Sequence, residues 1–356
     1  MSRTSKLQRL IVDAHEDIAY NSVVLGRDFL DSILDKRARE KPPNLQVGTA
    51  TIGLPELLQA NVRIVFASIW PAPCNYPNLK VTPCYTTNQE AYVQGKEQLA
   101  YYHTLSKDPR IQLVTTREDV RRVVNSSDEC LGLLLSIEGG DSIPTPQHVQ
   151  ELWASGVRVI GPSHRRTQYA GGTGQPGPLT PVGRELLSEM ARVSLILDVS
   201  HMAEESFFQA LDQFHGPVLA SHSNCRAYVP TDRQLSDEMI QALVKRGGVI
   251  GVVLYNDFLL VDWKKNHKVK SDVTLAAAVK QIRHICDIAG DTTHVGLGSD
   301  LDGGFGMESI PLEMDNAADL PKIGDALAKA HFTDKEVGNI MAGNWLRFLE
   351  ESLPSA

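Results

Sequence analysis

The chain has 356 residues, 42% of them hydrophobic and 22% charged, with 35 Lys and Arg against 43 Asp and Glu for a formal net charge of −8. This composition is typical of a soluble globular protein, and no run approaches the roughly 20 apolar residues that span a bilayer, so we exclude a membrane-spanning protein. The charge is mild and spread along the chain, which argues against general nucleic-acid binding. The length suits one large domain over residues 1–356.

The first nine residues and the cysteines bear on the cellular compartment. Charged residues at the start lead into a few apolar positions before Asp13, too few for a signal-peptide core, so we expect a cytoplasmic protein. Five cysteines are an odd number without Cys-x-x-Cys spacing, which indicates neither a disulfide framework nor a zinc ribbon. Cys74 and Cys84 share one Pro-rich loop and could pair, but in a reducing compartment we expect them to stay reduced.

Apolar runs alternate with segments of helical spacing along the whole chain. The expected strands are Leu10–His15, Arg63–Ile69, Gly132–Ile137, Val157–Pro162, Leu195–Val199, Val218–His222, Val249–Tyr255 and His294–Gly298. The expected helices are Leu54–Ala60, Glu90–Ser106, Arg117–Val124, Pro146–Ser155, Pro181–Arg192, Glu204–Phe214, Ser236–Arg246, Leu275–Ala289 and Asp334–Glu350.

Eight strands that alternate with helices predict a parallel sheet closed into a (β/α)8 barrel of the TIM type. The alternative, a doubly wound open sheet, is weakened because no dinucleotide-type glycine fingerprint follows the first strand. We expect loop insertions around 21–50, 71–90 and 165–180 on this single barrel domain.

Side chains that bind metals or move protons follow most of the expected strands. His15 and Asp17 form a His-x-Asp pair, and residues two apart in a strand point to the same face, so together they make half of a metal site. The other strand ends carry Glu138, His164, His201, His222, Tyr255 and Asp300. Each alone is more often a solvated loop residue, but the carboxyl ends of barrel strands converge on one mouth, where such enzymes have their active sites.

Seven short segments in order give the sequence a specific resemblance to the renal (membrane) dipeptidase family, zinc-dependent peptidases of family M19 among the amidohydrolase-type barrels. The segments are Asp13-Ala-His-Glu-Asp17, Ser136-Ile-Glu-Gly-Gly140, Leu197-Asp-Val-Ser-His201, Ser221-His-Ser-Asn224, Asp232-Arg-Gln-Leu-Ser-Asp237, Gly298-Ser-Asp-Leu-Asp-Gly303 and Gly343-Asn-Trp-Leu-Arg347. They extend from the first expected strand to the last expected helix.

The resemblance implies two Zn²⁺ ions per chain. It assigns one ion to His15 and Asp17, the other to His201 and His222, and makes Glu138 the bridge between them. Mn²⁺ or Co²⁺ suit the same imidazole and carboxylate donors. Many amidohydrolases bridge their metals with a modified lysine on strand four, but residues 157–164 contain no lysine, so the bridge must come from elsewhere.

The resemblance also implies hydrolysis of small dipeptides, L-Xaa followed by an L- or D-residue, through a metal-bridging hydroxide. Asp300 would take and return the proton, His164 would donate to the oxyanion, and Arg233 would bind the substrate carboxylate. Tyr255 is expected to line the substrate site. The chain departs from the family pattern after His164, where Arg165 and Arg166 follow, so side-chain preference stays open.

Two alternative functions remain open. One is a related metal-dependent amidohydrolase that acts on an N-acyl amino acid or another carboxylate-bearing amide or ester. The other is a metal-binding homologue without turnover, against which the presence of both Asp300 and Arg233 counts. The expected partner is a small dipeptide, with no nucleic acid and no membrane, and a homodimer is an allowed assembly.

Overall fold

The computed structural model describes residues 10–40, 47–76, 81–127 and 129–355. Its strands are β1 (Ile11–Glu16), β2 (Val62–Ile69), β3 (Ile111–Leu113), β4 (Leu131–Glu138), β5 (Val157–Gly161), β6 (Ala170–Gly172), β7 (Gln175–Leu179), β8 (Ile196–Asp198), β9 (Val218–Leu219), β10 (Ile250–Val252) and β11 (Val295–Leu297). Its α-helices are α2 (Ile18–Leu25), α3 (Ile33–Arg39), α4 (Leu54–Gln59), α5 (Asn88–Leu105), α6 (Arg117–Asn125), α7 (Val149–Ala154), α8 (Pro181–Arg192), α9 (Glu204–Gln213), α10 (Asp237–Lys245), α11 (Asn256–Leu259), α12 (Leu275–Ala289), α13 (Pro321–Lys329), α14 (Asp334–Gly338) and α15 (Asn344–Ser352).

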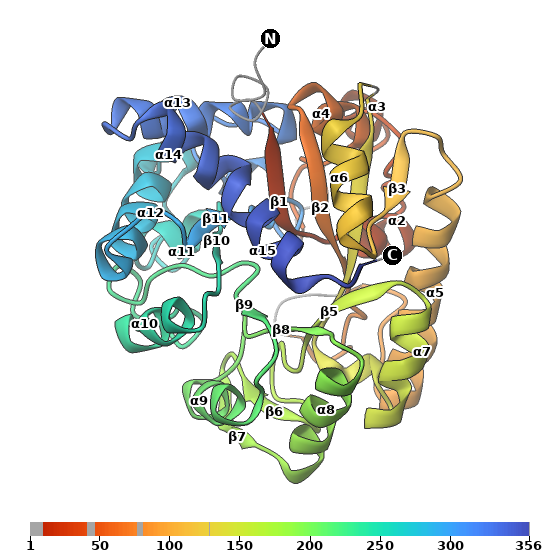
Figure 1. The fold of residues 1–356 in the computed structure, drawn as a ribbon. Helices are drawn as coiled ribbons and strands as arrows, with labels where there is room; N and C mark the ends of the chain where they lie inside the picture. Colours follow the sequence, from red (N-terminus) through yellow and green to blue (C-terminus); the bar gives the residue numbers. More distant parts are fainter. Residues whose placement is uncertain (1–9, 41–46, 77–80, 128, 356) are drawn as a thin grey trace.

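Eight parallel strands form the barrel, in the order β10, β11, β1, β2, β4, β5, β8, β9. A parallel bridge between Ala220, just after β9, and Ile250 on β10 nearly closes the ring. Helices lie around the strands, with α12 and α13 on the opposite side of the molecule from α5 and α7 (Figure 1). The expected (β/α)8 fold is therefore confirmed.

All eight expected strands belong to the barrel, and differences from expectation lie mainly in the connections. The strand β3 pairs with the first half of β4 and is only three residues long, too short for a periodic pattern. The hairpin of β6 and β7 lies in a sequence rich in Gly and Pro, which is typical of a loop. The expected helix Asp334–Glu350 is α14 and α15 joined by a π-helical turn at Asn339–Gly343.

One face of the strands forms a buried cluster with the last helix. Val12, Phe66, Leu134 and Ile196 pack in it with Trp345 of α15, and all five side chains are fully buried. Two residues further along the strands, the same face carries Ser68 after Phe66 and Asp198 after Ile196, and Glu138 follows Leu134 by four. This face is the barrel interior, apolar at the end that α15 covers and polar at the carboxyl ends.

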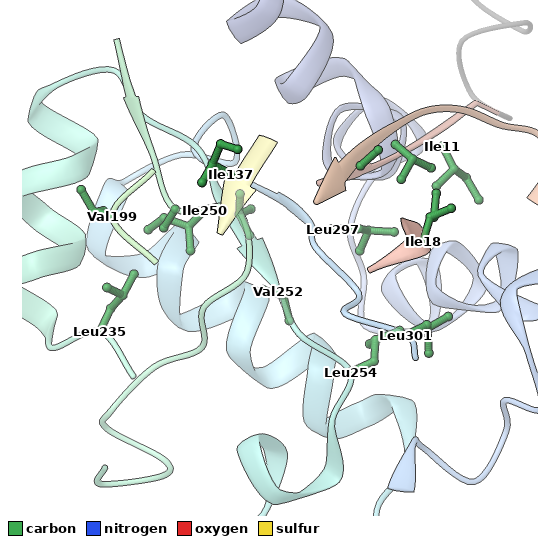
Figure 2. Packing of buried hydrophobic residues seen from close by; sticks show 14 of the residues in the cluster. Ile11, Ile18, Ile137, Val199, Leu235, Ile250, Val252, Leu254, Leu297 and Leu301 are labelled. Carbon is green, nitrogen blue, oxygen red and sulfur yellow. The ribbon is translucent and has the colours of Figure 1, made fainter. Parts of the chain in front are cut away.

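The opposite face of the strands packs against the surrounding helices in a larger apolar cluster. Figure 2 shows part of this packing, including Ile250 and Val252 of β10 and Leu297 of β11. Among the described residues, no helix has the length and apolar character needed to cross a bilayer.

Cys74 and Cys84 form a disulfide, contrary to the expectation that they stay reduced. Their Cα atoms lie 4.9 Å apart because the two ends of the loop are already paired: Cys74 N donates to Tyr85 O, and Tyr85 N donates to Ala72 O, both at 2.9 Å. Sequence spacing gives no information on this backbone pairing. Cys225 and Cys286 are buried thiols outside this disulfide.

Candidate active site

The donor residues expected from the sequence meet at the carboxyl ends of the barrel strands. His15 and Asp17 lie at the end of β1, Glu138 is the last residue of β4, and His201, His222 and Asp300 follow β8, β9 and β11 by three residues each. The exposed fraction of each of these side chains is 11% or less. Five strands therefore bring metal-competent groups to one place.

His15 is surrounded by carboxylates. Its Nε2 lies 3.5 Å from Glu138 Oε2, 3.8 Å from Asp17 Oδ1 and 3.8 Å from Asp300 Oδ1, yet it has no hydrogen-bond partner. A buried nitrogen without a partner is costly, and a cation between it and the carboxylates would remove that cost.

The other oxygen of Glu138 faces two further imidazoles. Glu138 Oε1 lies 3.0 Å from His201 Nε2 and 3.3 Å from His222 Nε2, and the two nitrogens are 3.0 Å apart. The donor atoms of His15, Asp17 and Glu138 lie within 4.8 Å of one another, as do those of Glu138, His201 and His222. Glu138 thus belongs to both sets, and the donor types and spacing fit two metal ions that share one carboxylate.

Burial and the neighbouring charges set the protonation of this cluster. Burial, together with the positive charge of Arg233, lowers the pKa of His201 well below its usual range, so its imidazole is neutral, as a metal ligand must be. Burial and nearby His15 do the same to the pKa of His222. Burial, the largest cause, would lower the pKa of His15, but the carboxylates of Glu138, Asp17 and Asp300 together outweigh it and raise that pKa.

A second layer of polar groups orients the ligands, and sequence reasoning did not single it out. Ser221 Oγ lies 2.7 Å from His222 Nδ1 and donates a short hydrogen bond to Asp198. Thr173 Oγ1 lies 3.1 Å from His201 Nδ1. Such contacts fix the tautomer and the ring orientation of ligating histidines. The signal for Asp198 was present, because it is a charged residue inside a buried strand.

The backbone is unusual at several of these positions. His201 and Asp300 adopt φ values of +65° and +60°, a conformation rare for residues other than glycine. Gly303 lies beside Asp300, and a Cβ at position 303 would collide with the Asp300 carboxylate. Gly139, at φ +81°, turns the chain directly after Glu138. These turns direct the strand-end side chains into the site.

A cavity of about 330 Å³ lies over the donor cluster, and the three remaining expected residues line it: His164, Arg233 and Tyr255. His164 Nε2 lies 3.6 Å from Glu138 Oε1. Tyr255 stacks on Phe305, with ring centroids 4.3 Å apart. All nine residues expected from the sequence are therefore brought together, and Trp70 and Tyr76 line the cavity in addition.

Arg233 is buried, and not all of its guanidinium nitrogens have hydrogen-bond partners. Its two terminal nitrogens donate to Ser223 Oγ at 3.1 Å and to His222 O at 2.7 Å, while Nε has no partner. Within the described residues it forms no ion pair, and burial lowers the pKa of its guanidinium. A buried charge of this kind is stabilised by an anionic group that enters the cavity.

Groups of side chains that could hold metal ions, placed at the carboxyl ends of a (β/α)8 barrel, are the arrangement expected of a metal-dependent hydrolase. The family model of the membrane dipeptidases matches residues 3–353. The chain belongs to the membrane dipeptidase family, peptidase family M19, and is a metallo-dipeptidase of that family.

Related sequences agree with this assignment. An uncharacterized protein from the pqqA 5′ region of Klebsiella pneumoniae is 31% identical over 251 residues, 68% of this chain and 89% of that protein. The dipeptidase tcpJ of Claviceps purpurea is 28% identical over 248 residues, 68% of this chain and 55% of that protein. The match thus spans about half the length of this longer relative.

Solved structures share the fold over nearly the full length. A metallo peptidase of Rhodobacter sphaeroides, liganded with a phosphinate mimic of L-Ala-D-Ala, has a TM-score of 0.77 at 22% identity, covering 96% of this chain and 99% of that one. The probable dipeptidase PvdM of Pseudomonas aeruginosa has a TM-score of 0.81 at 18% identity, covering 98% and 97%.

Proposed function

We propose that the protein is a binuclear zinc dipeptidase that hydrolyses the amide bond of small dipeptides with a free carboxylate. One observation carries the proposal. The guanidinium of Arg233, which forms no ion pair among the described residues and whose Nε has no hydrogen-bond partner, lies at the same cavity as two donor sets that share Glu138. Imidazole and carboxylate donors suit Zn²⁺, and Mn²⁺ or Co²⁺ are the nearest substitutes.

His15 and Asp17 would hold one ion, His201 and His222 the other, and Glu138 both. When bound, such ions supply a water of lowered pKa and polarise the scissile carbonyl. Asp300 extends from the neighbouring strand end to within 3.8 Å of His15, where it accepts the proton of the attacking water and returns it to the leaving amine.

The other side chains act on the substrate itself. His164 lies at the cavity wall beside Glu138 and donates to the oxygen on which negative charge develops. Arg233 pairs with the terminal carboxylate and so fixes the register of the dipeptide. Tyr255, held by its stack on Phe305, lines the same cavity and would contact the substrate there.

The test is turnover of a dipeptide library, with L- and D-residues at the second position, by the zinc-loaded protein. The D-series is included because the Rhodobacter sphaeroides relative was crystallised with a mimic of L-Ala-D-Ala. Hydrolysis of free dipeptides, with C-terminal amides much slower, is expected. Equal rates on N-acyl amino acids or simple esters would favour the broader amidohydrolase, and zinc binding without turnover would favour the non-catalytic homologue.

Compartment and assembly stay predictions. The sequence predicts a cytoplasmic protein and allows a homodimer. Disulfides such as the one between Cys74 and Cys84 persist in oxidising compartments, which argues against the cytoplasmic location. Cell fractionation with thiol labelling tests the location, and size-exclusion chromatography tests the assembly.

A further inference from the structure

A second cavity, of about 420 Å³, adjoins the site, and Arg233 is not among the residues that line it. The two cavities share Trp70, Glu138 and His164, so they meet at the reaction centre. Arg233 lines one cavity, whereas Asp141 lines the other. A dipeptide with its carboxylate on Arg233 and its amide bond near Glu138 must point its first residue into this second cavity.

The wall of the second cavity carries an acidic group that has no cationic partner among the residues that the structure describes. Asp141 lies on the 3-10 turn Gly140–Ser142 that follows Glu138, and it is hydrogen-bonded to the hydroxyl of Tyr85, next to the Cys74–Cys84 disulfide. Among the described residues it forms no ion pair. Burial raises the pKa of Asp141 to about 6, although the hydrogen bond from Tyr85 acts in the opposite direction and lowers this pKa. The carboxyl group is therefore mostly ionised at pH 8.

The two arginines that line the same cavity, Arg165 and Arg166, form no ion pair with Asp141. Arg166 donates from its guanidinium to the carbonyl of Pro176 on β7. Arg165 lies over the ring of Tyr76, with 6.0 Å from its guanidinium carbon to the ring centroid. Neither arginine is among the causes of the pKa shift of Asp141, which are burial and Tyr85.

We propose that Asp141, supported by Tyr85, is a specificity residue that selects dipeptides with a cationic first side chain, of the lysine or arginine class. The inference rests on the proposed dipeptidase function. It concerns the side chain and not the substrate's α-ammonium group, because that group lies roughly 2.5 Å from the scissile carbon and stays beside Glu138. A lysine side chain extends its ammonium group further, into the cavity that Asp141 lines.

The experiment compares kcat/KM of the zinc-loaded protein at pH 8 for Lys-Ala, Met-Ala and Glu-Ala, whose first side chains are similar in length and differ in charge. A charged hydrogen bond contributes about 1.5–3 kcal/mol, so the ratio of Lys-Ala to Met-Ala should be about tenfold or more. Asp141→Asn should bring this ratio near one, and Asp141→Lys should favour Glu-Ala. Glu97→Gln, an exposed charge loss on α5, should leave the ratio unchanged.

Several outcomes overturn the inference. If the wild-type protein hydrolyses Met-Ala as well as Lys-Ala, or prefers Glu-Ala, Asp141 does not select a cation. If Asp141→Asn slows all three dipeptides by the same factor, the residue binds the α-ammonium group or has a structural role. If none of the dipeptides is hydrolysed by the metal-loaded protein, the proposed function itself fails, a result distinct from equal rates.

Discussion

Glu138 and Asp141 lie three residues apart, yet they belong to two regions of different character. Glu138 ends a fully buried strand, and its oxygens lie within 3.6 Å of imidazoles from four other strand ends. Asp141 lies on a short turn, and its hydrogen-bond partner Tyr85 comes from the loop that the disulfide closes. The strand ends thus hold the reaction chemistry in a rigid frame, and the loops above them determine which substrates reach it.

The largest effect on this difference between strand ends and loops is expected when the charge of Glu138, which both donor sets share, is removed. Glu138→Gln should lower the affinity for both ions together. The loss should exceed the roughly 10- to 100-fold that a residue in contact with the ligands contributes, and activity should fall to background. Metal analysis after dialysis checks the first effect. One ion lost with the other retained would contradict the bridging position of Glu138.

The next largest effect is expected at the proton-transfer position. Asp300→Asn should lower kcat by about 10²- to 10⁴-fold, because general acid-base catalysis typically contributes that much, while two ions per chain are retained. Steady-state kinetics and metal content are measured on the same sample. Normal turnover with full metal content would exclude the role, and lost metal would make Asp300 a ligand.

Arg233 tests whether the cavity recognises a carboxylate. Breaking a buried charge pair costs about 2–5 kcal/mol, so Arg233→Met should lower kcat/KM for a free dipeptide by roughly 30- to 5,000-fold. The rate on the C-terminal amide, already low, should change much less. His164→Ala is the matched comparison, since it acts on the carbonyl common to both substrates and should slow both by similar factors. Equal losses in Arg233→Met would indicate a structural residue.

The smallest effect is expected in the second layer. Ser221→Ala removes the hydroxyl between Asp198 and His222 and should weaken metal affinity by about 10- to 100-fold, with kcat largely restored at saturating zinc. Ser206→Ala is a matched control, because Ser206 is equally buried but donates to backbone carbonyls away from the metal-binding cluster. A Ser221 variant with unchanged affinity would show that the strand ends orient His222 without this contact.

The sequence predicted the strand ends well because two independent signals coincide there. Apolar runs of four to eight residues mark the barrel strands, and their ends carry His, Asp or Glu, so periodicity and chemistry give the same positions. The barrel then places these residues together, whatever the lengths of the loops. Asp198 is the last residue of β8, but it was missed because it acts through Ser221, a contact between two neighbouring strand ends that the sequence does not reveal.

The loop region was predicted poorly for an equally physical reason. The pairing of Cys74 with Cys84 and the contact of Asp141 with Tyr85 depend on how the loop after β2 folds back on the turn after β4. Neither position repeats with a helical or strand period. The same holds for the hairpin β6 and β7, where Gly and Pro indicated a loop although the backbone is paired.

The left-handed backbone at His201 and Asp300 has a consequence for evolution and engineering. A residue other than glycine in this conformation costs of order 1 kcal/mol or more, so glycine at either position would be favoured by selection for thermal stability alone. Such selection would remove the proposed metal donor or the proposed proton acceptor. Libraries of this protein screened by heat should therefore accumulate inactive variants at positions 201 and 300, unless turnover is selected in the same round.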